Sequence, residues 1–417
     1  MKFIIRGGKR LAGTITVGGM KNAATPAIAA TLLTDEPCTL QNIPRIADVE
    51  AMLSIIRSMG GKAEWVGDNS VCIENKGVDI EKLDQKQVKR LRSSILFLGP
   101  LLTRWETVTL AEPGGCIIGN RPLDAHLIGL QKLGAQITRS EEGITAQRSA
   151  LRGAHIVQRE ASVTGTENII MAATAAAGRT QIMYAAMEPH VQDICHLLVA
   201  MGAHIEGIGT TTLTIDGGRR LQGADYTIIP DTIEAGTFLI LGFATHSEIT
   251  IQGARAEHME VVLETLSAMG AQYEVGDGYI RTLPSSALQA IRMETRAYPG
   301  IPTDMQSLFG VLATQTQGAT MIHETMFEGR LGYIQELKKM GADASVLDPH
   351  RVMISGPTPL YGKEIHSLDL RAGAALVIAA LIASGESIIH DAQIIDRGYE
   401  RIEERLSALG ADIMRQG

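Results

Sequence analysis

The sequence predicts an α/β protein built from six copies of one unit, grouped as two domains of three. The first observation is a phrase of an apolar residue, glycine and a small residue, which returns six times at a spacing of 68 to 74 residues. Self-similarity at a fixed period indicates repeated supersecondary units. The second observation is the length of 417 residues, for which two or three domains are expected. Units of this size are too large for a thin solenoid, so two packed groups of three fit better.

The six copies share one order of local signals. Apolar residues at helical spacing precede each copy, as Met259, Val262, Leu263 and Leu266 do before the fourth. The glycine then stands where a left-handed residue closes a helix, and a strand-like segment follows it. The glycines of the six copies are Gly60, Gly134, Gly202, Gly270, Gly341 and Gly410. Each unit is therefore expected to contain a helix, a glycine stop and a strand, with a further helix and strands.

Alanine-rich apolar segments predict that further helix. They cover residues 23–33, 168–177, 235–245 and 372–384, and helices that are apolar on all sides are buried ones. The last segment is the longest apolar run, and it is too short to span a bilayer. Residues 1–6 begin no long apolar region, so we expect no signal peptide.

Charge and cysteine usage exclude several classes of protein. The net charge of −8 argues against a general nucleic-acid binder. Cys38, Cys72, Cys116 and Cys195 lie far apart without a C-x-x-C pair, which excludes the common zinc and redox spacings. This usage favours a reduced cytoplasmic protein over a disulfide framework. We therefore expect a cytoplasmic protein, a monomer or weak homo-oligomer, with no metal, no cofactor and no nucleic-acid or membrane partner.

Residues 113–122 read Pro-Gly-Gly-Cys-Ile-Ile-Gly-Asn-Arg-Pro and predict a loop that carries two reactive groups. Proline keeps the segment out of helices and central strands, and glycine permits a ligand to approach the backbone closely. The thiol of Cys116 could donate a proton or attack, and the guanidinium of Arg121 matches phosphate and carboxylate. The alternative is a glycine-rich surface turn in which the cysteine has no role.

Six cations stand at junctions between predicted elements, where ligands tend to bind. They are Lys21, Arg92, Arg121, Arg330, Arg371 and Arg397. Lysine at a helix start opposes the macrodipole, so Lys21 indicates a bound anion there, unless it is a solvated surface lysine. Asp304 follows Pro302 and Thr303, where it would either cap a helix or act as a general base. Together the cations predict a substrate with several negative charges.

The motifs resemble the enolpyruvyl transferase family, and within it the members that act on UDP-N-acetylglucosamine. The similarity runs from end to end and is most specific in the cysteine loop of residues 113–122, which the shikimate-pathway members lack. The other matching motifs are Lys21-Asn22-Ala23, the segment 230–238, Pro302-Thr303-Asp304-Met305-Gln306, Asp369-Leu370-Arg371 and Asp396-Arg397-Gly398-Tyr399-Glu400.

The resemblance implies a two-domain inside-out α/β barrel of six βαβαββ-like repeats, three per domain. Residues 21–229 would form the first domain, and residues 1–20 with 230–417 the second. The family has its active site in the cleft between the two domains.

The resemblance also implies a reaction. The family transfers the enolpyruvyl group of phosphoenolpyruvate to the 3-hydroxyl of UDP-N-acetylglucosamine, releasing phosphate in the first committed step of peptidoglycan synthesis. By similarity, Asp304 is the base, Cys116 is the proton donor and the target of fosfomycin, and Asp369 assists deprotonation. The residues implied to bind phosphoenolpyruvate are Lys21, Asn22, Arg121, Arg330, Arg371 and Arg397. Those implied to bind the sugar nucleotide are Arg92, Arg121, Pro122, Leu123, Asp124, Ala125, Ser162, Val163, Asp304 and Met326.

Three positions depart from the family's pattern. They are Glu160, where some relatives carry lysine, Gly329, where they carry asparagine, and Leu331-Gly332-Tyr333 in place of Phe-Met-His. They leave open an enolpyruvyl transferase with another nucleotide or nucleotide-sugar acceptor. A non-catalytic paralogue that binds a UDP-sugar is the other alternative, although Cys116, Asp304 and Arg397 are all present.

Overall fold

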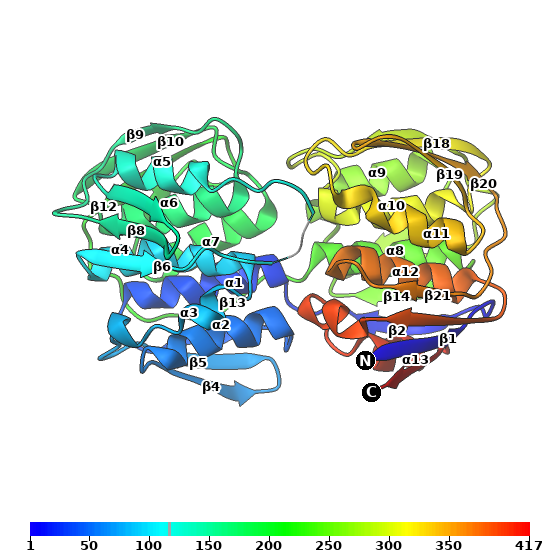
Figure 1. The fold of residues 1–417 in the computed structure, drawn as a ribbon, viewed down its shortest axis with the longest axis horizontal. Coiled ribbons are helices and arrows are strands. Elements are labelled where there is room, and N and C mark those ends of the chain that lie inside the picture. The colour runs from blue at the N-terminus through cyan, green and yellow to red at the C-terminus, as the bar shows by residue number, and fades with distance from the viewer. Residues whose placement is uncertain (116–117) are drawn as a thin grey trace. The chain divides into compact units, whose positions relative to one another are not determined.

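The computed structural model describes residues 1–115 and 118–417, and it has a mixed α/β fold made of two compact units (Figure 1). The first unit, here the 19–229 unit, contains residues 19–115 and 121–229. The second, the 230–417 unit, contains residues 1–18, 118–120 and 230–417. Cys116, the predicted proton donor, lies outside the described residues.

The 19–229 unit alternates helices with short strands. Its helices are α1 (Lys21–Ala30), η1 (Thr31–Leu33), α2 (Ala47–Ser58), η2 (Ile80–Lys82), α3 (Gln85–Val88), η3 (Arg92–Phe97), α4 (Leu98–Arg104), α5 (Asp124–Lys132), α6 (Val163–Ala175) and α7 (Pro189–Ala200). Its strands are β3 (Cys38–Gln41), β4 (Lys62–Gly67), β5 (Ser70–Glu74), β6 (Thr107–Leu110), β7 (Gln136–Ser140), β8 (Gly143–Gln147), β9 (His155–Val157), β10 (Gly178–Met183), β11 (His204–Glu206), β12 (Thr212–Gly217) and β13 (Asp225–Thr227).

The 230–417 unit begins with two strands from the start of the chain, β1 (Lys2–Arg6) and β2 (Ala12–Thr16). Its helices are α8 (Thr232–Ala244), η4 (Ala256–His258), α9 (Glu260–Ala268), η5 (Thr303–Met305), α10 (Gln306–Ala313), η6 (Arg330–Gly332), α11 (Tyr333–Lys339), α12 (Leu370–Ile382), η7 (Ala392–Arg397) and α13 (Ile402–Ala408). Its other strands are β14 (Glu248–Gln252), β15 (Tyr273–Gly276), β16 (Tyr279–Thr282), β17 (Arg292–Glu294), β18 (Gly318–His323), β19 (Asp343–Asp348), β20 (Arg351–Gly356), β21 (Glu364–His366), β22 (Glu386–His390) and β23 (Asp412–Gln416).

Each unit has three sheets among its described residues. The strand orders are β13-β3-β5-β4, β6-β8-β7 and β11-β12-β10-β9 in the 19–229 unit, and β21-β22-β1-β23, β15-β16-β14-β2 and β17-β18-β20-β19 in the 230–417 unit. Strand β1 is antiparallel to both β22 and β23, with Ile4 opposite Ile388 and Met414. Strand β2 is parallel to β14. The first 16 residues therefore complete two sheets whose other strands come from the last part of the chain.

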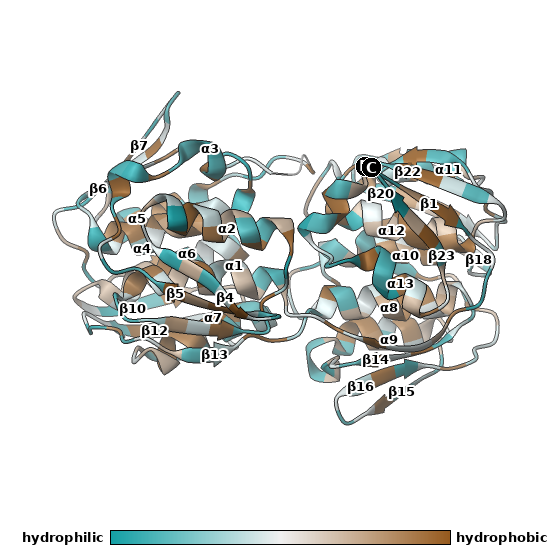
Figure 2. Cartoon of the chain, turned by 90° about the horizontal axis from the view of Figure 1, so that it is seen from below, coloured by the Kyte–Doolittle hydropathy of each residue, from teal (hydrophilic) through white to brown (hydrophobic). Residues whose placement is uncertain are grey.

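The core of each unit is a group of apolar helices that lies between the sheets (Figure 1). In the 230–417 unit α8, α10 and α12 pack against one another, and nearly all their residues are buried. In the 19–229 unit α6 contacts both α1 and α4. Figure 2 shows these helices mostly in white to brown, with teal surfaces elsewhere in the same units. The predicted alanine-rich helices are thus the central ones.

The predicted glycine stops are confirmed by the backbone. Gly60, Gly134, Gly202, Gly270, Gly341 and Gly410 all have positive φ angles, between 90° and 108°. Each follows an amphipathic helix, α2, α5, α7, α9, α11 or α13, and precedes a strand. A side chain is strained at such angles, which explains why glycine recurs there.

None of the helices in the described residues is both long enough and apolar enough to cross a membrane.

Candidate functional site

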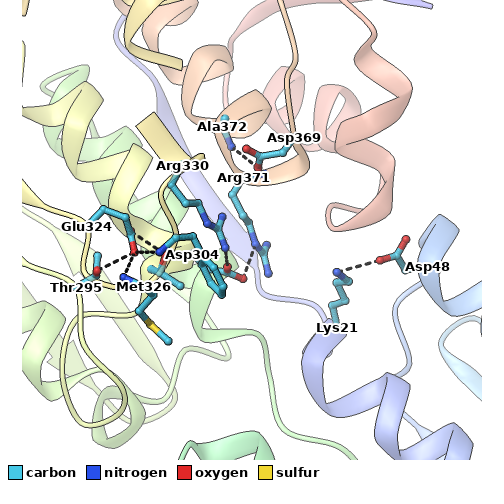
Figure 3. A network of polar contacts seen from close by, with 12 residues as sticks. Lys21, Asp48, Thr295, Asp304, Glu324, Met326, Arg330, Asp369, Arg371 and Ala372 are labelled. Atoms are coloured by element: carbon cyan, nitrogen blue, oxygen red, sulfur yellow. Dashed lines mark hydrogen bonds and ion pairs between the residues drawn. The ribbon is translucent and has the colours of Figure 1, made fainter. Parts of the chain in front are cut away.

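The carboxylate of Asp304 is bound by two arginines from separate parts of the 230–417 unit (Figure 3). Arg330 Nη2 donates to Asp304 Oδ1 at 2.6 Å, and Arg371 Nε donates to Asp304 Oδ2 at 3.0 Å. Asp304 lies in η5 before α10, Arg330 opens η6, and Arg371 lies in the first turn of α12. The fold therefore brings three of the predicted site residues into direct contact.

Both guanidiniums of this cluster are buried, whereas the carboxylate is partly accessible. The exposed fractions of the side chains are 8% for Arg330, 2% for Arg371 and 23% for Asp304. Arg330 Nε and Arg371 Nη1 are buried and have no hydrogen-bond acceptor among the described residues. Burial alone would lower the pKa of Arg371. The electrostatic effects of Asp304, Tyr399 and Asp231 are together larger and of opposite sign, so the pKa of Arg371 is raised. The cluster holds two permanent cations with unused donors.

The structure contradicts one of the two interpretations of Asp304, the helix cap, and leaves the general base as a prediction. Helix η5 has Pro302 at its N-cap position, without a side-chain cap, and the cap position of α10 is Met305, also without one. The expectation that Asp304 caps a helix is therefore wrong. Its carboxylate is engaged by Arg330 and Arg371 instead, because these guanidiniums reach it from η6 and α12.

Asp369 has the capping role that Asp304 lacks. Its carboxylate accepts hydrogen bonds from the backbone N–H groups of Arg371 and Ala372, at 2.8 and 3.0 Å, and so caps α12. An acidic cap is favourable at a helix N-terminus. Asp369 is 7% exposed. It therefore fixes the backbone from which the Arg371 side chain projects.

A buried glutamate that the sequence did not single out organises the neighbourhood of Asp304 (Figure 3). Glu324 is fully buried, and its Oε1 accepts hydrogen bonds from Thr295 Oγ1 and from the N–H groups of Met326 and Phe327. Its Oε2 accepts from Thr303 Oγ1 at 2.8 Å. Glu324 thus connects the segment that carries Asp304 with the turn that leads to Arg330.

The remaining predicted residues of the 230–417 unit lie at the ends of elements. Met326 is 42% exposed in the turn held by Glu324. Arg397 is the last residue of η7 and is half-buried. Tyr399 follows it, fully buried, and its hydroxyl pairs with Thr237 of α8 at 2.8 Å. The Arg371 guanidinium lies 5.5 Å from the centre of the Tyr399 ring, which links α12 to this segment.

Lys21 starts α1, as the sequence predicted, and the structure identifies an anion beside it. Lys21 Nζ lies 2.9 Å from Asp48 Oδ2, with side-chain exposures of 15% and 6% (Figure 3). Asp48 belongs to the first turn of α2. Asn22 is the second residue of α1 and is half-buried. An internal carboxylate therefore compensates the lysine.

Arg92 and Arg121 lie together in the 19–229 unit. The Arg92 guanidinium donates to the backbone carbonyl of Arg121 and, at 3.3 Å, to that of Pro122. Burial, with the like charge of Arg121, lowers the pKa of Arg92 to about 10. His126 lies behind them, and burial and the two arginines lower its pKa to about 3. His126 is therefore neutral near pH 7, and the positive charge of this cluster lies on Arg92 and Arg121.

His126 forms a buried network that the sequence did not predict. Its Nε2 pairs with Thr164 Oγ1 and its Nδ1 with Asn168 Nδ2, both at 3.0 Å. Asn168 also donates to the carbonyl of Ile95 and accepts from the N–H of Gly99. The network connects α5, α6 and the η3–α4 segment, and so positions Arg92 relative to the start of α6. A histidine on a short helix carries no sequence signal for this role.

A cavity of about 200 Å³ lies next to this cluster, between the start of α5 and β9. Several predicted nucleotide-binding residues line it, and so does the atypical Glu160. The residues that line the cavity are Pro122, Asp124, Ala125, Ile128, Gly129, Ile156, Val157, Gln158, Arg159 and Glu160.

The other predicted nucleotide-binding residues have different positions. Leu123 does not line the cavity, and the whole residue is only 1% exposed. Ser162 caps α6 through the N–H of Gly165, and Val163 is the first residue of that helix.

Residues 118–120 are held by the turn before Arg330. The carboxylate of Glu328 accepts a hydrogen bond from the N–H of Asn120 at 2.8 Å, and the N–H of Gly329 donates to the Ile118 carbonyl at 2.9 Å. A Cβ atom at Gly329 would lie 2.6 Å from the carbonyl carbon of Ile118. Glycine at this departure from the family's pattern therefore permits the close approach.

The clusters offer cations for anionic groups, carboxylates for proton transfer and a cavity for a larger ligand. Among residues 1–115 and 118–417 no group of three or more histidine, cysteine, aspartate or glutamate side chains is arranged to hold a metal ion.

Comparison with known proteins shows similarity to carboxyvinyltransferases. A model of the EPSP synthase (3-phosphoshikimate 1-carboxyvinyltransferase) family matches residues 5–406. The UDP-N-acetylglucosamine 1-carboxyvinyltransferase of Koribacter versatilis is 44% identical over 421 residues, covering 100% of this chain and 96% of that protein. The proteins of the same name from Bradyrhizobium diazoefficiens and Campylobacter hominis are 44% and 42% identical, each over 100% of this chain and 98% and 99% of their own.

Solved structures share the fold. The enolpyruvyl transferase NikO from Streptomyces tendae superposes with a TM-score of 0.90 at 24% identity, over 99% of this chain and 98% of its own. EPSP synthase from Acinetobacter baumannii superposes with a TM-score of 0.74 at 21% identity, over the full length of both chains.

Proposed function

The chain belongs to the EPSP synthase family of carboxyvinyltransferases, and from this premise we propose that it transfers the enolpyruvyl group of phosphoenolpyruvate to the 3-hydroxyl of UDP-N-acetylglucosamine, with release of phosphate. The observation that carries the choice of acceptor is the identity of 42 to 44% over the whole chain with relatives that are named for this activity. The product would enter peptidoglycan synthesis.

The reaction is an addition followed by an elimination. In the addition, the acceptor oxygen forms a bond to C2 of phosphoenolpyruvate, its proton passes to the Asp304 carboxylate, and C3 takes a proton from the Cys116 thiol. In the elimination, C3 returns a proton to the Cys116 thiolate, the double bond re-forms, and the bond from C2 to the phosphate oxygen breaks, so that phosphate leaves. Asp369, which caps α12, supports the return of protons and holds Arg371 in place.

The intermediate carries a carboxylate and a phosphate, so the cations have separate tasks. Arg330 and Arg371 bind the carboxylate, because both are buried and still have unused donors. Lys21, Arg121 and Arg397 bind the phosphate, and Asn22 contacts the transferring group. Preorganised cations stabilise charge where it stands in the transition state, without reorganisation at the moment of reaction.

The sugar nucleotide is assigned to the cavity of the 19–229 unit and its surroundings. Pro122, Asp124 and Ala125 line that cavity, and Arg92 lies next to it. Leu123, Ser162 and Val163 are assigned to the nucleotide as well, while Asp304 and Met326 are assigned to the sugar. The proposal therefore assigns substrate-binding roles to residues of both units.

The finer description of the fold is also a proposal. Each unit's three sheets and buried helices constitute one inside-out α/β barrel of three repeats, with boundaries at residues 21 and 230. Three sheets around buried helices in each unit support this description. We place the enzyme in the cytoplasm as a monomer or weak homo-oligomer.

The test is phosphate release from phosphoenolpyruvate, measured with and without UDP-N-acetylglucosamine. We expect release only with the sugar nucleotide, and its loss after treatment with fosfomycin, which alkylates Cys116. The matched variant is Cys116→Ser, which should resist alkylation. Release that is independent of the sugar nucleotide, or alkylation of the Cys116→Ser protein at residue 116, would contradict the assignment. If phosphate is released only with another nucleotide sugar, the acceptor is a different one, and the positions near Glu160 would be the first to examine for its selection.

A further inference from the structure

The Asp304 carboxylate binds Arg330 and Arg371. These are the two arginines to which the proposed function assigns the carboxylate of phosphoenolpyruvate. Asp304 Oδ1 receives Arg330 Nη2 at 2.6 Å and Asp304 Oδ2 receives Arg371 Nε at 3.0 Å. One carboxylate of the protein thus lies where one carboxylate of the substrate is expected. The same residue is also the proposed base, and a carboxylate held by two cations accepts a proton less readily than a free one.

The burial of the three side chains fits an exchange of carboxylates. The arginines are 8% and 2% exposed, so they cannot turn to bulk water for compensation. Leaving a buried charge without its partner is strongly unfavourable, and an internal carboxylate avoids this in the free protein. Asp304 is 23% exposed, so it is the member of the cluster that is in contact with solvent and can leave the arginines.

Unused donors show that the guanidiniums have capacity for a further ligand. Arg330 Nε and Arg371 Nη1 are buried and donate to no acceptor among the described residues. Both nitrogens belong to side chains that are more than nine-tenths buried. Asp304 therefore satisfies only part of what the two guanidinium groups offer. A planar carboxylate ligand could use the unused donors as well.

We propose that the substrate carboxylate displaces the Asp304 carboxylate from Arg330 and Arg371, and that Asp304 becomes the proton acceptor only through this exchange. This inference rests on the proposed function and adds that the base becomes active only when phosphoenolpyruvate is bound. In the free enzyme Asp304 compensates the two cations. When the substrate carboxylate takes over that task, Asp304 is released and receives the hydroxyl proton as the acceptor oxygen bonds to C2.

The exchange couples base activation to the presence of the second substrate. Without phosphoenolpyruvate the carboxylate stays ion-paired and does not deprotonate the acceptor. The surrounding structure keeps the cations in position during the exchange, since Asp369 caps the helix that carries Arg371 and Glu324 holds the turn before Arg330. The movement is thereby confined to the Asp304 side chain.

The exchange is tested by calorimetric titration of the full-length protein with two probes. Pyruvate carries a carboxylate without phosphate, and inorganic phosphate carries no carboxylate. We expect Asp304→Asn to bind pyruvate about ten-fold more tightly than the wild type, because the competing charge is gone. Its affinity for inorganic phosphate should change by less than about two-fold, because the competition concerns the carboxylate position only.

Two controls make the result specific. Asp304→Glu keeps the competing charge and should bind pyruvate like the wild type. Asp304→Ser, checked by circular dichroism, replaces Asp304→Asn if the latter does not fold. An unchanged affinity of Asp304→Asn for pyruvate, or an equal gain for pyruvate and phosphate, would overturn the exchange.

Turnover separates this inference from the proposed function. If the wild type releases phosphate from phosphoenolpyruvate in the presence of the sugar nucleotide, but Asp304→Asn gains no affinity for pyruvate, the exchange alone is wrong. If the wild type shows no turnover with any acceptor, the proposed function is wrong, whatever the affinity for pyruvate.

Discussion

The arginine clusters of the two units have different hydrogen-bond partners. In the 230–417 unit Arg330 and Arg371 share a carboxylate, and the net pKa of Arg371 is raised because opposite charges outweigh burial. In the 19–229 unit Arg92 donates to backbone carbonyls, and burial with the like charge of Arg121 lowers its pKa to about 10. A carbonyl cancels no charge, so these hydrogen bonds leave the positive charge of Arg92 in place, whereas Arg330 and Arg371 already share a carboxylate.

The largest expected effect comes from removing one arginine of the paired cluster. Arg371→Ala should lower kcat/KM for phosphoenolpyruvate by about 10²–10³, since it removes a preorganised cation and one of the ion pairs of Asp304. It should also destabilise the protein by about 3–5 kcal/mol, because a buried ion pair is broken. Steady-state kinetics and urea unfolding measure the two effects.

The matched control for this prediction is Arg351→Ala, which breaks an exposed pair with Asp348. It should alter stability by less than about 0.5 kcal/mol and leave turnover unchanged. Equal losses in both variants would mean that the buried pair has no special role.

The second prediction concerns the residue that organises the paired cluster. Glu324→Ala removes the acceptor of four hydrogen bonds, from Thr295, Thr303, Met326 and Phe327, and should lower kcat/KM by about 10²-fold. Glu324→Gln keeps Oε1 as an acceptor and should restore most of the activity.

If Glu324 had only a structural role, Glu324→Ala and Glu324→Gln would differ in stability but would have the same KM and the same kcat. The exposed Glu294, paired with Arg296, provides the control Glu294→Gln, which should behave like the wild type. Loss of activity in Glu294→Gln would show that the effect is not specific to Glu324.

The third prediction concerns the buried histidine next to the other cluster. The pKa of His126 is about 3 in the folded protein and about 6.5 in the unfolded chain, so only the unfolded state gains a proton as the pH falls below about 6.5. Stability is therefore lost on acidification. The contribution of His126 to this loss between pH 7 and pH 5 should be about 2 kcal/mol.

Urea unfolding of His126→Gln at the two pH values measures this contribution, because the variant should lose less stability than the wild type. The exposed His155 gives the control His155→Gln, which should show the same pH dependence as the wild type. Identical pH dependence in His126→Gln and the wild type would contradict the assignment of a neutral buried histidine.

The smallest expected effect lies at the cavity of the 19–229 unit. Glu160→Lys replaces an acidic lining residue with a cation, and should lower KM for the sugar nucleotide by about three-fold at low salt. The gain should fade as ionic strength rises, because salt screens exposed charges. Kinetics at two salt concentrations check this. An unchanged KM, or a gain for phosphoenolpyruvate instead, would place the nucleotide elsewhere.

Much of the local structure could be read from the sequence because it depends on neighbours along the chain. The six glycine stops followed from helical periodicity and the left-handed region, and all six have positive φ. Lys21 opens α1 and pairs with Asp48, while the bound anion that the sequence indicated there stays a prediction. The identity of that partner could not be predicted, since Asp48 is 27 residues away and resembles any acid in the first turn of a helix.

What the sequence by itself determined is the repeat, the central helices, the family and most of the site's residue types, because periodicity and motifs are local or shared with relatives. What only the tertiary structure decided is which charges meet. Asp304 looked like a helix cap, yet Arg330 and Arg371 reach it from positions 26 and 67 residues away in the sequence. Glu324 and His126 gave no signal at all. Pairing between distant side chains depends on how the helices and turns pack, and no spacing along the chain records that.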